Sequence, residues 1–223
     1  MLGIDGAICL CLDKRKEFWP EMLDGLHNVG KKPKLFIAGD GTDESLVYDY
    51  IDNPNPPLIG WGYGREGYKH HHYNALACHK EMIKYAKSNG WKNTLFLEDD
   101  IYVLDRYKSV LDNAPTDIDY DLLYLGWWKG DENDSWNRYI EDEYSRTRIC
   151  GWDRVDRVSG FHAVVVNERL YDLILSLPMN NPLDCQLIPY YHILRTYIII
   201  PKVIHIRNIH SFCEGTTITR RVL

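Results

Sequence analysis

The chain has 223 residues, 45% of them hydrophobic and 26% charged, which is the composition of one globular α/β domain of ordinary size. Its formal net charge of −6 argues against a nucleic-acid-binding protein, because such proteins present a basic surface. No stretch approaches the roughly 20 apolar residues that span a bilayer, and no signal peptide precedes the first apolar run, so we expect a cytoplasmic protein without a membrane span.

Strands and helices alternate in the first part of the chain. Residues 6–12 form an apolar run that predicts a strand, and an amphipathic helix follows it. Residues 35–38 predict a second strand, and a strand–helix–strand series indicates a parallel pair joined by a right-handed crossover. A loop rich in Pro and Gly extends over 52–67, and the pattern then predicts a helix over 74–88.

The run from Thr94 to Asp100 dominates the functional interpretation. It begins as a buried strand and ends in three carboxylates, Glu98, Asp99 and Asp100. Ligands gather at the carboxyl ends of parallel strands, and adjacent like charges favour a cation between them, for which Mg²⁺ or Mn²⁺ supplies the oxygen-binding chemistry. Another interpretation is a solvated acidic turn. A third is the acidic strand of an NTPase, which the sequence disfavours because residues 39–42 lack the lysine of a phosphate-binding loop.

The second half predicts further strands around a polar segment. We interpret residues 127–158 as an inserted segment on the acceptor side of a single domain that spans 1–223. The fold class that we expect is α/β, with a mostly parallel, Rossmann-like central sheet flanked by helices. The other predicted elements are strands at 121–126, 161–166 and 197–200, and helices at 102–113, 168–177 and 182–194.

Several side chains lie where a ligand would meet the sheet. Asp13, Arg15 and Asp40 follow the first two strands, at the place of a nucleotide base and diphosphate, although they also fit a charge cluster at a helix start. Trp127 and Trp128 end a later strand and would either stack on an acceptor sugar or anchor the insert.

In order along the chain, seven stretches resemble the glycosyltransferase family 25 group, which includes lipooligosaccharide and collagen galactosyltransferases. This sequence has cysteine at Cys9 or Cys11 where the family usually has asparagine, and Cys78 where it has serine. The resemblance implies a GT-A fold, in which an acidic motif holds a metal on a nucleotide-sugar. The stretches are Cys9 to Arg15, Cys78-His79, Leu95 to Asp100, Tyr120 to Gly126, Ser159 to Val166, Pro182 to Asp184, and His210-Ser211.

The same resemblance implies roles for the site. Asp100 would bind Mn²⁺ or Mg²⁺ directly, with His210, or His205 in its place, completing the metal shell. Glu98 or Asp99 would contact the ribose or the donor sugar. Asp184 would act as general base and give inversion, although a carboxylate after a proline at a helix start also fits a capping role.

These residues predict a metal-dependent glycosyltransferase that uses a nucleotide-diphosphate sugar, with UDP-sugars favoured, and a glycan or glycoconjugate acceptor. One rival is a sugar nucleotidyltransferase, but such enzymes open with a glycine-rich loop after the first strand, where this chain has residues 12–15. The other rival is a catalytically inactive carbohydrate-binding module that keeps the GT-A fold and releases no nucleoside diphosphate.

Overall fold

The structure is a computed structural model that describes residues 3–26, 32–38, 69–128, 151–156, 158–179, 181–207, 210–211 and 216–217. In this part of the chain seven strands form a central sheet in the order β2-β1-β3-β7-β5-β8-β6. The strands are β1 (Gly6–Leu12), β2 (Lys34–Ala38), β3 (Asn93–Glu98), β5 (Leu122–Trp128), β6 (Gly151–Arg154), β7 (Ser159–Asn167) and β8 (Thr196–Ile200).

The strand directions follow from the pairing. Strand β1 is parallel to β2 and β3, and β5 is parallel to β8. Strand β7 is antiparallel to both of its neighbours, β3 and β5, and β6 is antiparallel to β8. Strands β1, β2, β3, β5 and β8 therefore run in one direction, which confirms the predicted α/β fold with a mostly parallel central sheet.

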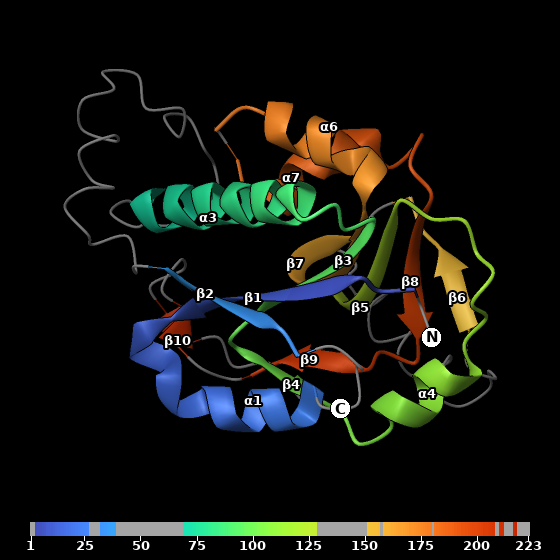
Figure 1. The fold of residues 1–223 in the computed structure, drawn as a ribbon, viewed down its shortest axis with the longest axis horizontal. Helices are drawn as coiled ribbons and strands as arrows, with labels where there is room; N and C mark the ends of the chain where they lie inside the picture. The colour runs from blue at the N-terminus through green and yellow to red at the C-terminus, as the bar shows by residue number, and fades with distance from the viewer. Residues whose placement is uncertain are drawn as a thin grey trace.

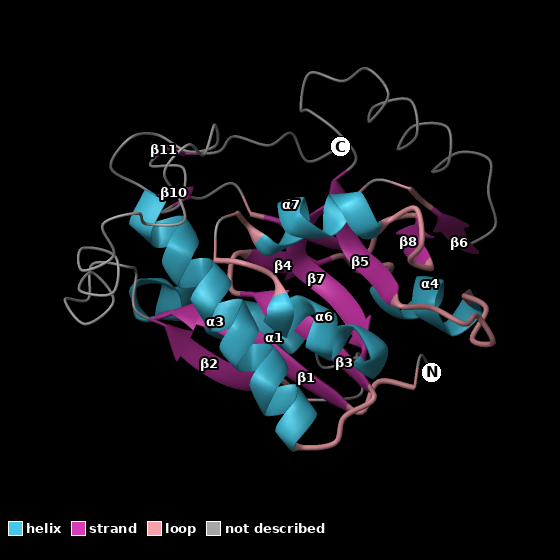
Figure 2. Cartoon of the chain, turned by 90° about the horizontal axis from the view of Figure 1, so that it is seen from above, coloured by secondary structure: helices cyan, strands magenta, loops and turns pink. Residues whose placement is uncertain are grey.

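Helices cover both faces of the sheet (Figure 1). The α3 face carries α3 (Lys69–Ser88), α6 (Tyr171–Ser176) and α7 (Leu183–Leu187), and Figure 2 shows α3 and α6 side by side over the strands. The opposite face, called the α1 face here, carries α1 (Trp19–Gly25) and α4 (Tyr107–Asn113). Short 3₁₀ segments are η1 (Asp13–Phe18), η3 (Glu168–Leu170) and η4 (Ile188–Tyr190).

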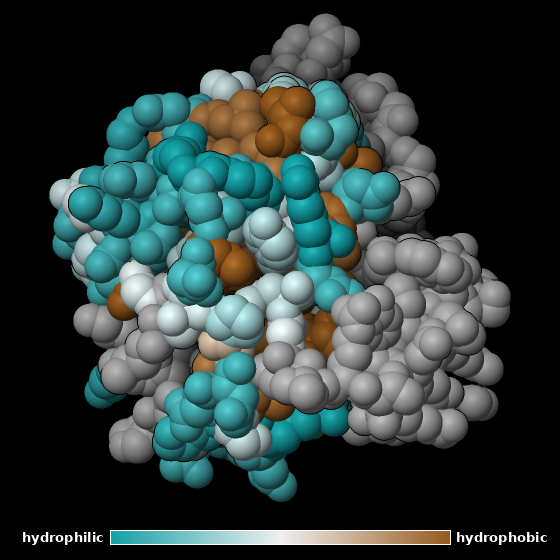
Figure 3. Space-filling model, turned by 90° about the vertical axis from the view of Figure 1, so that its right-hand side faces the viewer, coloured by the Kyte–Doolittle hydropathy of each residue, from teal (hydrophilic) through white to brown (hydrophobic). Residues whose placement is uncertain are grey.

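The core is divided by the sheet into two apolar clusters. Because successive residues of a strand point to opposite faces, Phe96 packs in the cluster of the α3 face and Leu97 in that of the α1 face. Both side chains are buried, and burying such a side chain contributes roughly 1.5–3 kcal/mol. Figure 3 shows apolar side chains at the top of one end of the molecule, on the side of α6 and α7, above a largely hydrophilic surface.

Two parts of the sequence prediction need correction. Residues 102–113 are not one helix, because Ile101–Val103 forms strand β4 and α4 begins only at Tyr107. Strand β4 pairs with β9 (Ile204–Ile206), and a partner a hundred residues away is not visible in local periodicity. Helix α7 ends at Leu187 instead of continuing to 194, since Pro189 follows in η4 and has no N–H to donate.

The predicted insert at 127–158 overlaps the sheet at both ends. Trp127 and Trp128 belong to β5, and Gly151–Arg154 forms β6 against β8. Val158 is fully buried in the core of the α3 face. These ends belong to the domain proper, while residues 129–150 lie outside the described residues.

Two cysteines of β1 are buried thiols. Cys9 and Cys11 are fully buried in the cluster of the α1 face, and neither forms a disulfide. Burial raises the pKa of the Cys9 thiol well above its ordinary value, so this thiol stays protonated. In the described part of the chain, no helix is long and apolar enough to cross a membrane.

Candidate active site at the carboxyl edge of the sheet

One edge of the sheet collects the carboxyl ends of its parallel strands. Strand β1 ends at Leu12 and passes directly into η1, which carries Arg15. Strand β3 runs parallel to β1 and ends at Glu98, so Asp99 and Asp100 form a turn at the same edge. Helix α3 begins at this edge, as Figure 1 shows. The sequence therefore places the acidic turn where open α/β sheets bind ligands.

Asp99 is turned toward the α1 face and is 2% exposed. Its Oδ2 accepts hydrogen bonds from the Leu12 backbone N–H at 2.6 Å and from Trp19 Nε1 at 3.4 Å. Its Oδ1 accepts a hydrogen bond from Arg15 Nη1 at 2.9 Å. Burial raises the pKa of the Asp99 carboxyl, and Arg15 and the Leu12 N–H partly offset that effect. Asp99 thus joins the ends of β1 and β3.

Glu98 belongs to the other face. It lies two residues after Phe96, and its Oε1 is 3.2 Å from Nε2 of His79 on α3. Burial raises the pKa of Glu98, but the imidazoles of His79 and His162 and the Arg15 guanidinium outweigh burial, so the net pKa is lowered. The Glu98 side chain is 28% exposed, so part of it reaches the surface at the edge.

Asp100 contacts the same cation as Asp99, which is the Arg15 guanidinium. Its Oδ2 is 3.4 Å from Arg15 Nη1, and the side chain is 16% exposed. Burial lowers the pKa of Arg15, but the charges of Asp100 and Asp99 raise it by more. The net pKa is therefore raised, and the buried guanidinium remains charged. The three consecutive acids are therefore compatible because Glu98 contacts His79 of α3, while Asp99 and Asp100 share the Arg15 guanidinium.

Asp184 reaches the same region from α7. Its Oδ2 accepts a hydrogen bond from the Gly160 N–H at 2.8 Å, and its Oδ1 accepts one from the Cys185 N–H at 2.9 Å. Gly160 lies on the part of β7 that extends past the last β3–β7 pair, Leu97 with Ala163. Gly160 has φ of 91°, a conformation that favours glycine. The α7 start is thereby fixed at the edge that carries the acidic turn.

Two tyrosine hydroxyls lie beneath Asp184. Tyr124 of β5 and Tyr191 share a buried hydrogen bond of 2.9 Å between their hydroxyl oxygens. Burial raises the pKa of Tyr191 well above its ordinary value, and the Tyr124 hydroxyl and the Asp184 carboxylate add to this shift. These hydroxyls therefore stay protonated at neutral pH, as uncharged neighbours of the carboxylate.

The structure favours the anchoring interpretation of Trp127 over acceptor stacking. Its side chain is 3% exposed within the core, and Nε1 donates to the Ile199 carbonyl at 3.0 Å. Lys202 Nζ lies 4.7 Å from the centre of its ring. With the ring already covered, Trp127 is not placed to stack on a sugar. The side chain of Trp128 lies outside the described part, as do the side chains of Asp13 and His210 and the whole of Asp40.

The C-terminal tail returns to the acidic turn. Strand β9 pairs with β4 directly after Asp100, and the Arg207 N–H donates to the Asp100 carbonyl at 2.6 Å. Three residues later β10 (His210–Ser211) begins, so its backbone can lie no more than about 10 Å from Arg207. His205, the alternative metal ligand, faces Tyr102 with ring centroids 5.6 Å apart.

Sequence reasoning missed two residues of this site and underrated a third. Buried His162 comes next to Glu98 only because β7 is antiparallel, a direction that the sequence did not reveal. Gly126 leaves room for it, because a Cβ there would meet His162 Nε2 at 2.7 Å. Arg207 could not be assigned to the site from the sequence, because it directly follows β9, a strand that the sequence did not predict. His79 entered only through the Cys78-His79 resemblance, although its position three residues after Leu76, on the apolar side of α3, was a usable signal.

Among the described residues, no group of three or more His, Cys, Asp or Glu side chains is arranged to hold a metal. Asp100 nevertheless has suitable chemistry, because Mg²⁺-type ions take carboxylate oxygens and are often held by one or two carboxylates plus substrate phosphates. Metal binding by Asp100 and His210 therefore stays a prediction.

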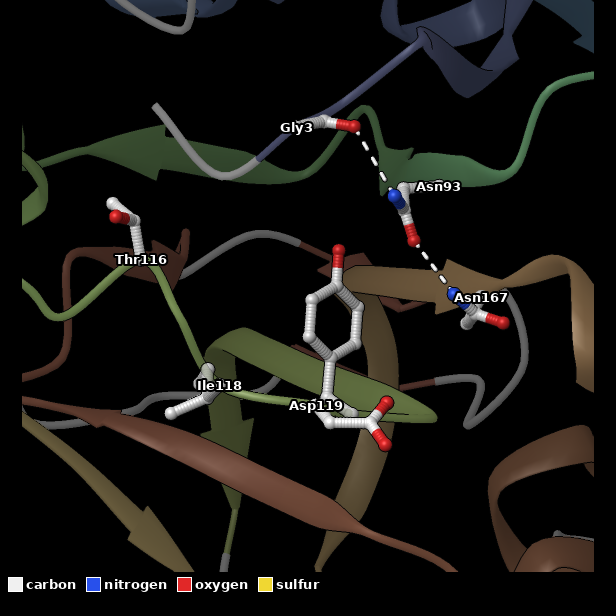
Figure 4. Close-up of a pocket in the computed structure, with 7 residues that line it drawn as sticks. Gly3, Asn93, Thr116, Ile118, Asp119 and Asn167 are labelled. Carbon is white, nitrogen blue, oxygen red and sulfur yellow. Dashed lines mark hydrogen bonds between the residues drawn. The ribbon is translucent and has the colours of Figure 1, made fainter.

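A hollow lies at the other end of β3 (Figure 4). It has a volume of about 290 Å³ and polar lining groups, among which Asn93 Nδ2 donates to the Gly3 carbonyl at 3.2 Å and Asn167 Nδ2 to Asn93 Oδ1 at 2.8 Å. Asn93 begins β3 and Asn167 ends β7, so this hollow is at the edge opposite the acidic turn. It belongs to a separate region from the candidate site.

Comparisons with known proteins give only weak likenesses. No protein-family model and no curated protein matches the chain. A solved glycosyltransferase involved in the glycosylation of the major capsid of PBCV-1 is 12% identical, with a TM-score of 0.42 over 86% of this chain and 81% of that chain. A197 from STIV is 13% identical, with a TM-score of 0.38 over the same shares. We therefore base the function on the residues of the site.

Proposed function

We propose that the chain is a metal-dependent glycosyltransferase of the GT-A type. It would transfer a sugar from a nucleotide-diphosphate sugar, with UDP-sugars favoured, to a glycan or glycoconjugate acceptor. The observation that carries this proposal is the convergence of Glu98, Asp100 and Arg15 with Asp184 at the carboxyl edge of the sheet. Charged groups of both signs at such an edge suit a diphosphate and a polar acceptor.

The donor half of the site rests on Asp100 and Arg15. A divalent ion held by Asp100, with His210 as a further ligand, would supply charge neutralisation for the departing diphosphate. Arg15 keeps its positive charge next to Asp100 at 3.4 Å and adds a fixed cation at the same place. Asp13 and Asp40 remain candidates for contacts to the nucleotide.

The acceptor half rests on Asp184. As a general base it would take the proton from the attacking hydroxyl, which gives inversion at the anomeric carbon. The hydrogen bonds from the Gly160 and Cys185 N–H groups fix the direction of the carboxylate, and each carboxylate oxygen has a second lone pair that can accept from a hydroxyl. Trp128 remains a candidate for acceptor stacking.

Release of nucleoside diphosphate tests the proposal. We expect the chain, given Mn²⁺ and a panel of UDP- and GDP-sugars, to release one nucleoside diphosphate, faster when glycan acceptors are added. The matched control is Asp100→Asn, which keeps the shape of the side chain and removes its charge. Binding of a sugar or nucleotide without release in any combination would instead indicate the inactive carbohydrate-binding module.

A further inference from the structure

The three acids of the turn differ in what they still offer to a ligand. Asp99 is 2% exposed, and its two oxygens accept three hydrogen bonds from Leu12, Trp19 and Arg15. At this exposure the Asp99 carboxylate offers almost no surface to a ligand hydroxyl. Glu98 lies at the same edge with a side chain that is 28% exposed and with one oxygen near His79. The geometry therefore singles out Glu98 over Asp99 for direct donor contact.

His79 is itself held firmly. It lies in the middle of α3, is 6% exposed, and its ring packs against Phe161 of β7 with centroids 5.0 Å apart. Phe161 in turn contacts Phe96 of β3 at 5.9 Å. The imidazole is thus fixed between α3 and strands β3 and β7. Its Nε2 is 3.2 Å from Glu98 Oε1.

A glutamate has three side-chain torsions, and its carboxylate at a sheet edge would sample several orientations if nothing held it. Contact with a buried imidazole removes much of that freedom before a ligand arrives, and such preorganisation favours binding. The contact with His79 is made through Oε1, and because a carboxylate offers about four lone-pair sites, Glu98 can also accept a hydrogen bond from a ligand hydroxyl.

We propose that His79 is a positioning residue of the donor site, which fixes Glu98 so that its carboxylate accepts a hydroxyl of the nucleotide-sugar. This inference rests on the proposed function and deepens it: the donor contact of the acidic turn is Glu98, and its orientation is set by a histidine on α3. His79 acts through Glu98 and does not touch the donor.

The test measures the dissociation constant of UDP and GDP with Mn²⁺ by titration calorimetry. His79→Leu removes the ring nitrogen and keeps an apolar side chain against Phe161, and it should weaken binding about tenfold, the equivalent of one charge-assisted contact. His79→Gln places an amide N–H near the position of Nε2 and should stay within about threefold of the wild type. Thermal melts confirm that both variants are folded.

A double variant separates positioning from a structural role. In a Glu98→Ala background, His79→Leu should change the dissociation constant by less than about twofold, because the group that it positions is already gone. The role of His79 would be overturned if His79→Leu weakened binding equally in the wild-type and Glu98→Ala backgrounds. It would also be overturned if His79→Gln and His79→Leu lost the same affinity, or if a folded His79→Leu variant bound like the wild type. A wild type that binds neither nucleotide would overturn the proposed function, and this inference with it.

Discussion

Turnover of glycosyl transfer is expected to fall by about 10²–10⁴-fold when Asp184 is replaced with asparagine, because that is the usual contribution of a positioned general base. An asparagine has the same shape but cannot take the proton of the acceptor hydroxyl. Donor affinity should be unchanged, since Asp184 enters the site from α7 and not from the acidic turn. The measurement is steady-state transfer with the donor dissociation constant determined alongside.

The matched control for this variant is Asp172→Asn. Asp172 is also a carboxylate in a first helical turn on the α3 face, but its side chain is 81% exposed and pairs with Lys87 at the surface. It should lose no turnover. Largely intact turnover in Asp184→Asn would contradict the base assignment and would indicate a retaining enzyme, with Asp184 serving only to hold Gly160 and the start of α7.

The free energy of unfolding is expected to fall by about 3–5 kcal/mol when Arg15 is replaced with methionine, the loss found when one partner of a buried ion pair is removed. Arg15 is 8% exposed, and the change would leave Asp99 buried without a cation and Asp100 beside it. Chemical denaturation followed by circular dichroism measures the loss. Arg154→Met, at an exposed position of β6, is the control and should change little.

A second substitution tests the cause of that loss. Adding Asp99→Asn to Arg15→Met removes the uncompensated charge, so the double variant should be more stable than Arg15→Met alone, and the two effects should not add. A loss below about 1 kcal/mol in Arg15→Met would be the size of an exposed ion pair and would contradict the buried counter-charge described here.

The sequence predicted the main strands of the fold and the acidic turn on which the candidate site is built. The apolar runs that became β1 and β3, and the acids that follow β3, were visible because a buried parallel strand reads as an unbroken hydrophobic stretch. The carboxyl edge followed from that pattern and from general knowledge of α/β sheets. The directions of β7 and β6 and the β4–β9 ribbon were not predictable, because they depend on pairing between distant segments.

The acidic turn shows why site details were harder to predict. Sequence reasoning treated Glu98, Asp99 and Asp100 as one cluster that needs one cation. A strand alternates its side chains between faces, however, so Glu98 and Asp99 diverge to His79 and Arg15. That alternation could have been applied in advance, whereas the identity of the partners depends on how α3 and η1 pack on the sheet.

Calorimetric titration of UDP and GDP, each with and without Mn²⁺, on the wild type and Asp100→Ala tests the proposal that the acidic turn binds a nucleoside diphosphate through a metal. One nucleotide should bind the wild type tightly only with Mn²⁺, and Asp100→Ala should lose the effect of the metal. Absence of metal-dependent binding of either nucleotide to the wild type would contradict the claim and would leave the three carboxylates as a charge-balanced structural turn.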